Sequence, residues 1–379
     1  MNFELTDEHR MIRDAARDFA KTELLPGVIE RDETQTFPTE QIKKLGGLGF
    51  LGMMVDPKYG GAGMDSISYV LAMEEISKID SSTSVVMSVN NSLVCWGIET
   101  FGTEEQKEKY LKPLASGEII GAFCLSEPEA GSDATSQKTT AIEQDDCYLL
   151  NGTKNWITNG NTASVYLVIA QTDIDKGHKG INAFIVEKGI QGFEIGPKEN
   201  KLGIRGSDTH SLMFSDVKVP KENRIGDDGF GFLFAMKTLA GGRIGIASQA
   251  LGIASGSYEL ALQYSKERKT FGKEISKHQA IAFKLADMET EISAARLLCL
   301  KAAWLKDNNK NYDRAGAIAK VFASETAMKT TIEAVQIHGG YGFVKEYHVE
   351  RLMRDAKITQ IYEGTSEIQR IVISRSILN

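Results

Sequence analysis

The stretch Val165-Tyr-Leu-Val-Ile-Ala170 decides the fold class, because it interrupts a chain whose apolar periodicity is otherwise helical. Its β-branched and aromatic residues favour a strand, and similar runs occur at Ala183-Phe-Ile-Val186 and Ser211-Leu-Met-Phe214. Turn sequences such as Asn159-Gly160 and Lys179-Gly180 separate these runs. Since no helical segment intervenes, we expect an antiparallel sheet or barrel rather than a doubly wound sheet.

Helical patterns flank this region on both sides. From Thr6 to about Gly117 apolar residues recur at helical spacing, with Thr6 as an N-cap and Thr103-Glu-Glu-Gln106 as a capping box. After Gly229 long helices are expected at roughly 230–265, 276–307 and 314–337, with a last one starting near Gly364. The sequence therefore predicts an α+β multi-domain chain: an N-terminal α-helical domain (1–118), a middle antiparallel β domain (119–226) and a C-terminal four-helix-type α domain (227–379).

Composition narrows the possible functions. Of 379 residues, 42% are hydrophobic and 25% charged, and the net charge is -7 with no dense basic run, so a nucleic-acid partner is not expected. The acidic N-terminus resembles neither a signal nor a transit peptide, and no apolar stretch reaches the length of a membrane span. The four cysteines are scattered without metal-ligand spacing. We expect a soluble, cytoplasmic protein without a metal site.

Motifs for other chemistries are absent or misplaced in the sequence. The segment Gly47-Leu-Gly49-Phe-Leu-Gly52 matches GxGxxG, but it follows a helical pattern instead of a strand, so we interpret it as a helix end and turn. The six histidines do not cluster at ligand spacing, and no HExxH, P-loop or GxSxG signature occurs. Hydrolytic and metal-dependent chemistries therefore lose most of their support.

Several segments could instead hold a flat cofactor, although each also has a structural interpretation. Leu125-Ser-Glu-Pro-Glu-Ala-Gly-Ser-Asp133 could present hydroxyls and backbone N–H groups to an anion, or be a polar surface turn. Asn155-Trp-Ile-Thr158 places an aromatic plane beside a hydroxyl, although such a Trp is more often core. Arg268-Lys-Thr-Phe-Gly272 suits a pyrophosphate, and Gln336-Ile-His-Gly-Gly340 allows close backbone approach at a helix end.

The helix expected near 230–265 is unusually rich in glycine. Gly241, Gly242, Gly245, Gly252 and Gly256 each cost about 1 kcal/mol of helix stability relative to alanine. Close approach of another helix or of a ligand is the expected compensation.

In this order, the motifs resemble those of the acyl-CoA dehydrogenase family, and the resemblance spans essentially the whole chain. The resemblance also includes the segment Tyr362-Glu-Gly-Thr365 near the C-terminus. Within the family, Ser84-Val-Val-Met-Ser-Val-Asn-Asn-Ser-Leu93 and Gly242-Arg-Ile-Gly-Ile-Ala-Ser-Gln-Ala-Leu251 are similar to the short-chain, butyryl-CoA type.

The resemblance implies FAD between the β domain and the C-terminal helices. One set of residues would contact the flavin and pyrophosphate: Phe123, Leu125, Ser126, Ser132, Trp156 and Thr158. A neighbouring subunit would complete the site, with Arg268, Phe271 and Gln279 of one chain and Gln336, Gly339 and Gly340 of another sharing one FAD. Thr365 and Glu367 would adjoin the cofactor. A homotetramer, as a dimer of dimers, is the implied assembly.

The resemblance also implies the reaction, which belongs to fatty acid beta-oxidation. Glu363 would remove the α-proton of an acyl-CoA thioester while the β-hydrogen leaves as hydride to flavin N5, giving a trans-2-enoyl-CoA. Burial should raise the pKa of Glu363, and hydrogen bonds to the thioester carbonyl should stabilise the developing enolate. Some relatives carry the base immediately before the helix arginine instead, but here that position is Gly242.

Substrate contacts are expected from residues around this base, namely Ser132, Gly242, Arg243, Tyr362 and Gly364. Many relatives have an aspartate where Ala240 stands, so the contact to the adenine end of CoA is the weakest part of the prediction. No arginine occurs near Ser84, which disfavours a dicarboxylate substrate.

An electron-transfer flavoprotein is the implied electron acceptor. Three alternatives stay open at this point: a branched- or medium-chain acyl-CoA dehydrogenase, an acyl-CoA oxidase, and a non-catalytic protein that binds flavin or acyl-CoA.

Overall fold

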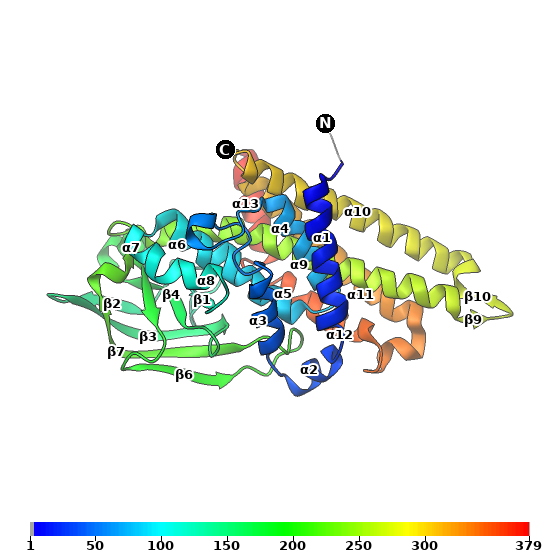
Figure 1. The fold of residues 1–379 in the computed structure, drawn as a ribbon, viewed down its shortest axis with the longest axis horizontal. Helices are drawn as coiled ribbons and strands as arrows, with labels where there is room; N and C mark the ends of the chain where they lie inside the picture. Colours follow the sequence, from blue (N-terminus) through cyan, green and yellow to red (C-terminus); the bar gives the residue numbers. More distant parts are fainter. Residues whose placement is uncertain (1–3, 379) are drawn as a thin grey trace.

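A computed structural model describes residues 4–378 and shows a helical part, a sheet and a second helical part in chain order (Figure 1). Thr6 caps the first helix, as predicted, and Thr103 and Gln106 form the predicted capping box. The N-terminal elements are α1 (Asp7–Phe19), η1 (Ala20–Leu24), α2 (Val28–Thr34), α3 (Thr39–Gly47), η2 (Pro57–Tyr59), α4 (Ser66–Ser77), α5 (Ser81–Ser88), η3 (Val89–Cys95), α6 (Trp96–Phe101), α7 (Glu104–Gln106), η4 (Lys107–Leu111) and α8 (Lys112–Ala115).

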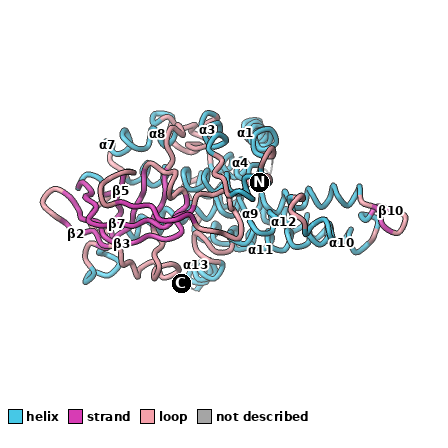
Figure 2. Tube along the Cα trace, turned by 90° about the horizontal axis from the view of Figure 1, so that it is seen from below, coloured by secondary structure: helices cyan, strands magenta, loops and turns pink. Residues whose placement is uncertain are grey.

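The middle part is one sheet at the end of the molecule opposite the long helices (Figure 2). Its strand order is β6-β7-β3-β2-β4-β5-β8, and β1 pairs with β4. The strands are β1 (Gly121–Cys124), β2 (Thr140–Glu143), β3 (Cys147–Thr158), β4 (Val165–Gln171), β5 (Ile181–Glu187), β6 (Phe193–Lys198), β7 (Thr209–Pro220) and β8 (Arg224–Ile225).

The strand β4, which contains the stretch that decided the fold class, is buried along its whole length. Val165, Leu167 and Ile169 belong to a core shared with the helices, whereas Tyr166 and Val168 belong to a core within the β domain. Both faces of the strand are thus covered, which explains its continuous apolar run.

The prediction of antiparallel pairing holds for most of the sheet, but two pairs are parallel. β1 runs parallel to β4, with Gly121 opposite Val165, and β2 meets β4 in parallel at Thr140 and Gln171. The chain enters the sheet at β1, which pairs with the central strand β4. It forms β4 itself only after β2 and β3. This order places β1, with Phe123, against the C-terminal helices.

The C-terminal part contains one helix more than the four expected. It comprises α9 (Gly231–Glu267), the hairpin β9 (Lys269–Thr270) and β10 (Lys273–Glu274), η7 (Ile275–Lys277), α10 (Gln279–Asp307), α11 (Asp313–His338), η8 (Gly339–Phe343), α12 (His348–Thr359) and α13 (Ser366–Leu378). The unpredicted helix α12 buries Val349, Leu352 and Ala356, at helical spacing.

The glycines of α9 allow other elements to approach closely, as expected. A Cβ atom on Gly252 would lie 2.4 Å from the carbonyl oxygen of Glu74 in α4, and one on Gly256 would lie 2.4 Å from that of Lys78. These contacts compensate for the low helix propensity of glycine.

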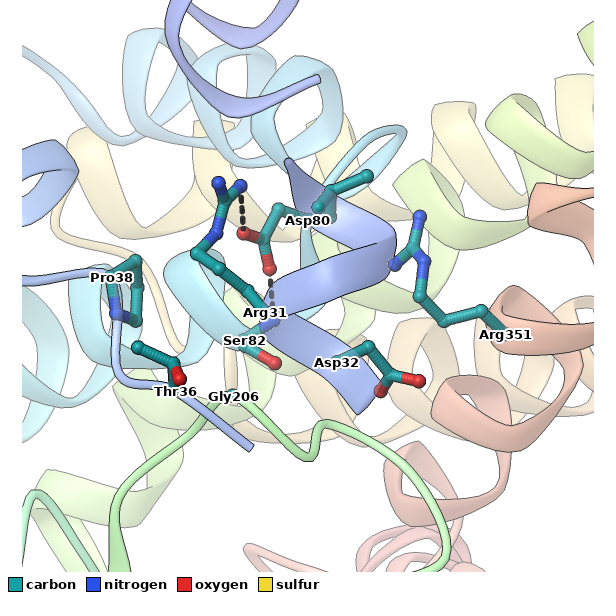
Figure 3. A pocket seen from close by; sticks show the side chains of 9 residues that line it. Arg31, Asp32, Thr36, Pro38, Asp80, Ser82, Gly206 and Arg351 are labelled. Carbon is teal, nitrogen blue, oxygen red and sulfur yellow. Dashed lines mark hydrogen bonds and ion pairs between the residues drawn. The ribbon is translucent and has the colours of Figure 1, made fainter. Parts of the chain in front are cut away.

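The three parts meet around a small charged pocket (Figure 3). Arg31 of α2 donates to Asp80 at 3.3 Å, while Gly206 from the β domain and Arg351 of α12 line the other sides. The pocket has a volume of about 10 Å³, enough for about one water molecule. We interpret it as a domain junction and not as a substrate site.

No helix within residues 4–378 has the length and apolar character that a membrane span requires. The same residues contain no group of three or more His, Cys, Asp or Glu side chains placed to hold a metal ion.

Candidate active site

The turn between α12 and α13 carries Glu363 in an uncommon backbone conformation. Glu363 has φ 52° and Gly364 has φ 89°, so two consecutive residues are left-handed. Such a conformation is costly for a residue with a side chain and persists only when its surroundings hold it. The Gln369 side chain donates to the carbonyl oxygens of Glu363 (3.2 Å) and Gly364 (2.9 Å), and Lys320 of α11 also donates to the Gly364 carbonyl.

The carboxyl group of Glu363 lacks a hydrogen-bond partner within the described part of the chain. Its Oε2 atom is buried and unpartnered, although the residue as a whole is partly exposed. Burial raises the pKa of Glu363 to about 7, against the opposing effect of the Lys320 and Arg243 charges. A carboxylate of this kind is far more basic than one in water and titrates near neutral pH, as a general base should.

Gly242 of α9 makes the space that the Glu363 carboxyl occupies. A Cβ atom at position 242 would lie 2.1 Å from Glu363 Oε2 and 2.8 Å from Leu93 Cδ2. At the neighbouring Gly241 the nearest atom would be 3.9 Å away. The sequence pointed to Gly242 because it removes an alternative base, and the structure shows that it also admits Glu363.

Tyr362 anchors the same turn to the N-terminal helices. Its hydroxyl donates to the Gln249 side chain, whose amide donates to Ser84 Oγ at 2.9 Å and to the Ser81 carbonyl at 3.0 Å. Burial raises the pKa of Tyr362 well above its usual value, so the hydroxyl stays protonated and remains a donor. Gln249 was not singled out from the sequence, because a glutamine within a helix carries no recognisable signal.

Arg243, the next residue after Gly242, is buried beside Glu363. It is 8% exposed, and its Nε atom has no partner within residues 4–378. Burial lowers its pKa, while the carboxylates of Asp313 and Glu363 raise it. An incompletely paired guanidinium is suited to binding an acceptor group of a ligand.

The segments expected to line the flavin lie side by side at the start of the sheet. The Asn155 N–H donates to the Ser126 carbonyl at 2.9 Å, which brings the loop after β1 next to the end of β3. Trp156 sits at an irregularity in the pairing of β3 with β7, has φ 57° and is 58% exposed. Thr158 is partly buried, while Ser132 lies in the exposed part of the loop.

A buried ion pair holds this loop in place, and sequence reasoning missed it. Lys154 Nζ lies 2.6 Å from Glu127 Oε1, with side-chain exposures of 0% and 1%. Lys154 also donates to the Leu125 carbonyl at 3.1 Å, and Glu127 accepts from the N–H groups of Lys138 and Thr139. The loop and the strand that carries Trp156 are thereby fixed relative to each other.

Six of the remaining predicted cofactor residues belong to elements at the end of the molecule opposite the sheet (Figure 1). Phe271 and Gly272 form the tip of the β9–β10 hairpin, with φ 50° and 80°, and the Phe271 side chain is 97% exposed. Gln279 begins α10, and Gln336, Gly339 and Gly340 surround the end of α11. One chain therefore does not bring all the predicted FAD residues together.

Within one chain, Arg268 lies close to the segment that follows Gly340. The Arg268 guanidinium lies 5.7 Å from the centre of the Tyr341 ring, just after Gly340. Thr365 and Glu367 lie apart from them, beside the Glu363 turn, where Thr365 accepts from the Ile368 N–H at 3.3 Å.

Comparison with known proteins identifies the family. Models of the N-terminal, middle and C-terminal domains of acyl-CoA dehydrogenases match residues 6–118, 122–217 and 229–378. The chain belongs to the acyl-CoA dehydrogenase family. It is 52% identical over 377 residues to the short-chain-specific acyl-CoA dehydrogenase of Clostridium acetobutylicum, covering 100% of both chains.

Solved structures confirm the acyl-CoA dehydrogenase fold. The butyryl-CoA dehydrogenase of Megasphaera elsdenii is 51% identical, with a TM-score of 0.99 and 100% coverage of both chains. A chain from a structural study of the electron transferring flavoprotein of Acidaminococcus fermentans is 52% identical, with the same TM-score and coverage. Acyl-CoA dehydrogenases are FAD-dependent oxidoreductases.

The residues of this acyl-CoA dehydrogenase fit a flavin. Trp156 offers an exposed aromatic plane on a strand, and the adjoining loop offers the hydroxyls of Ser126 and Ser132. Phe271, with almost its whole side chain uncovered, offers a second apolar surface for a cofactor or a neighbouring chain.

Proposed function

We propose that this chain oxidises short-chain acyl-CoA thioesters to trans-2-enoyl-CoA, with Glu363 as the catalytic base. The observation that carries the proposal is the buried, unpartnered Oε2 of Glu363 in the space left by Gly242. A buried polar atom without a partner is rare in proteins and calls for a functional reason. A substrate α-hydrogen is the partner that this chemistry supplies.

The surroundings of Glu363 suit proton removal. Its pKa of about 7 leaves a useful ionised fraction at neutral pH and narrows the gap to the weakly acidic α-proton. The Glu363 N–H is the proposed donor to the thioester carbonyl, where negative charge develops. Gly242, Tyr362 and Gly364 would shape the acyl site, and Arg243 would bind substrate from α9.

Bound FAD would supply the acceptor for the β-hydrogen, which leaves the substrate as hydride. The proposed contacts on the flavin side are Phe123, Leu125, Ser126, Ser132, Trp156 and Thr158. The other proposed contacts are Arg268, Phe271 and Gln279 of one chain and Gln336, Gly339 and Gly340 of another, with Thr365 and Glu367 adjoining. An electron-transfer flavoprotein is the proposed acceptor of the electrons, which the relative from the Acidaminococcus fermentans study supports.

Two relatives support the short-chain preference: one is named as short-chain specific, and the other is a butyryl-CoA dehydrogenase. We expect anaerobic butyryl-CoA to bleach the yellow colour of the FAD-loaded protein faster than longer or branched acyl-CoAs do. A panel of straight and branched acyl-CoAs, scored by flavin bleaching, measures this preference. Faster bleaching by a branched or medium-chain substrate would reassign the substrate, and no bleaching by any saturated acyl-CoA would contradict the dehydrogenase assignment.

The split between the two sets of cofactor residues supports an assembly of several chains, and we propose a cytoplasmic homotetramer built as a dimer of dimers. Phe271 and Phe343 are 97% and 86% exposed, and we expect a neighbouring chain to cover these apolar side chains. Sedimentation velocity of the FAD-loaded protein should give a species of four chains. A monomer that retains FAD on dilution would contradict the shared site.

A further inference from the structure

Lys320 of α11 is a buried cation that the proposed reaction does not yet use. It is only 1% exposed, and its Nζ donates to the Gly364 carbonyl, next to Glu363. Burying an ammonium group is costly unless its surroundings compensate. A lysine kept in such a position, one residue from the proposed base, calls for a specific role.

The ionisable groups around Glu363 come from several elements. Lys320 and Arg243 face it from α11 and α9, Tyr69 from α4, and Tyr362 from its own turn. The two tyrosines have pKa values raised by burial and stay neutral. Burial lowers the pKa of Lys320, and the Glu363 carboxylate opposes this effect. The charges that act on Glu363 are therefore those of two buried cations.

The hydrogen bond from Lys320 is partly redundant, whereas its charge is not. Gln369 Nε2 already donates to the Gly364 carbonyl at 2.9 Å and also reaches the Glu363 carbonyl. A neutral donor on α13 thus holds the turn from one side. Because a second neutral donor could have served the same carbonyl, the distinguishing property of Lys320 is its positive charge, which lies at the Gly364 carbonyl, one residue from Glu363.

We infer that Lys320 is a positioning residue for the proposed dehydrogenation: its hydrogen bond to the Gly364 carbonyl fixes the Glu363–Gly364 turn, and its positive charge favours the carboxylate form of Glu363. This inference rests on the proposed role of Glu363. Lys320 acts through Glu363 and need not touch the substrate. Burial raises the pKa of Glu363, and the Lys320 charge opposes this effect.

The Lys320→Met variant tests the charge. Glu363 accepts a proton only when ionised, so flavin reduction by butyryl-CoA should rise with pH through the pKa of Glu363. Removing the Lys320 charge should raise that pKa, so the rising limb of the pH–rate profile should shift to higher pH by about one unit. The reduction rate should fall about fivefold at pH 7 and recover at higher pH. Lys320→Arg, which keeps the charge, should leave the limb near its wild-type position.

Gln369→Leu is the matched control, because it removes a donor to the same carbonyl without changing charge. It should lower the rate at all pH values and leave the limb in place. An independent readout is the infrared carboxyl band of Glu363, identified by its absence in Glu363→Gln and titrated with pH. In Lys320→Met the band of the protonated carboxyl group should persist to higher pH than in wild type.

The outcomes separate the inference from the function on which it rests. Bleaching of wild type but not of Glu363→Gln would support the proposed function. If folded Lys320→Met then keeps the wild-type pH–rate profile and the wild-type titration of the infrared carboxyl band, the inference about Lys320 is wrong. If wild type is bleached by no acyl-CoA, the proposed function fails first. Thermal unfolding of each variant verifies folding. Should Lys320→Met not fold, Lys320→Arg and Lys320→Gln provide the charged and neutral pair.

Discussion

Replacing Glu363 by Gln is expected to reduce flavin bleaching by butyryl-CoA by about a thousandfold, the middle-to-upper range for removal of a general base. Glutamine fills nearly the same volume, so the left-handed turn held by Gln369 and Lys320 should persist. The amide cannot accept the α-proton as a carboxylate does. FAD content and acyl-CoA binding should stay close to wild type, and stopped-flow absorbance under anaerobic conditions measures the loss.

The matched control is Glu118→Gln, which changes an exposed glutamate outside the site. Its bleaching rate should equal that of wild type. Wild-type turnover in Glu363→Gln would move the base to another residue, whereas loss of FAD from that variant would mean that the substitution had damaged the fold.

Replacing Gly242 by Ala is expected to lower the rate of flavin reduction by about a hundredfold, because it displaces the base instead of removing it. The new Cβ would stand 2.1 Å from Glu363 Oε2, far inside van der Waals contact, so the carboxyl group must move by about 1 Å or more. A misplacement of about this size costs on the order of a hundredfold in rate. The Glu363 side chain can turn away, but the buried Leu93 side chain, 2.8 Å from the new Cβ, must shift as well, so stability should fall modestly.

Gly241→Ala is the control for this prediction, since its Cβ would meet nothing closer than 3.9 Å. It lies on the same helix and gains the same helix propensity, so it should keep wild-type activity and gain slightly in stability. Equal rates in the two variants would show that the space beside Gly242 is not needed for the base.

The order of helices and strands could be read from the sequence because apolar spacing and turn residues are local signals. Thr6, the Thr103 capping box and the buried stretch Val165–Ala170 all behave as their patterns indicate. The parallel pairing of β1 with β4 could not be read, because strand order depends on contacts far apart in the chain. Helix α12 was missed although Val349, Leu352 and Ala356 have helical spacing, since it follows a glycine-rich turn closely.

The candidate site, like the fold, could be predicted from the sequence only in part. Glu363 and Gly242 were recognisable because they belong to motifs, but their contact joins residues more than a hundred positions apart. Lys154, Gln249 and Lys320 carry no motif, and only their burial and partners in the folded chain reveal them. The left-handed backbone at Glu363 was equally hidden, because its side chain gives no sign of a positive φ.

The most direct test of the central claim separates proton removal from hydride transfer. An acyl-CoA analogue with sulfur in place of the β-carbon has α-hydrogens but no β-hydrogen to transfer. FAD-loaded wild-type protein, incubated with this analogue in deuterated water, should exchange its α-hydrogens, as mass spectrometry would detect, and Glu363→Gln should not. Exchange by Glu363→Gln at the wild-type rate would show that another group removes the proton and would contradict the role assigned to Glu363.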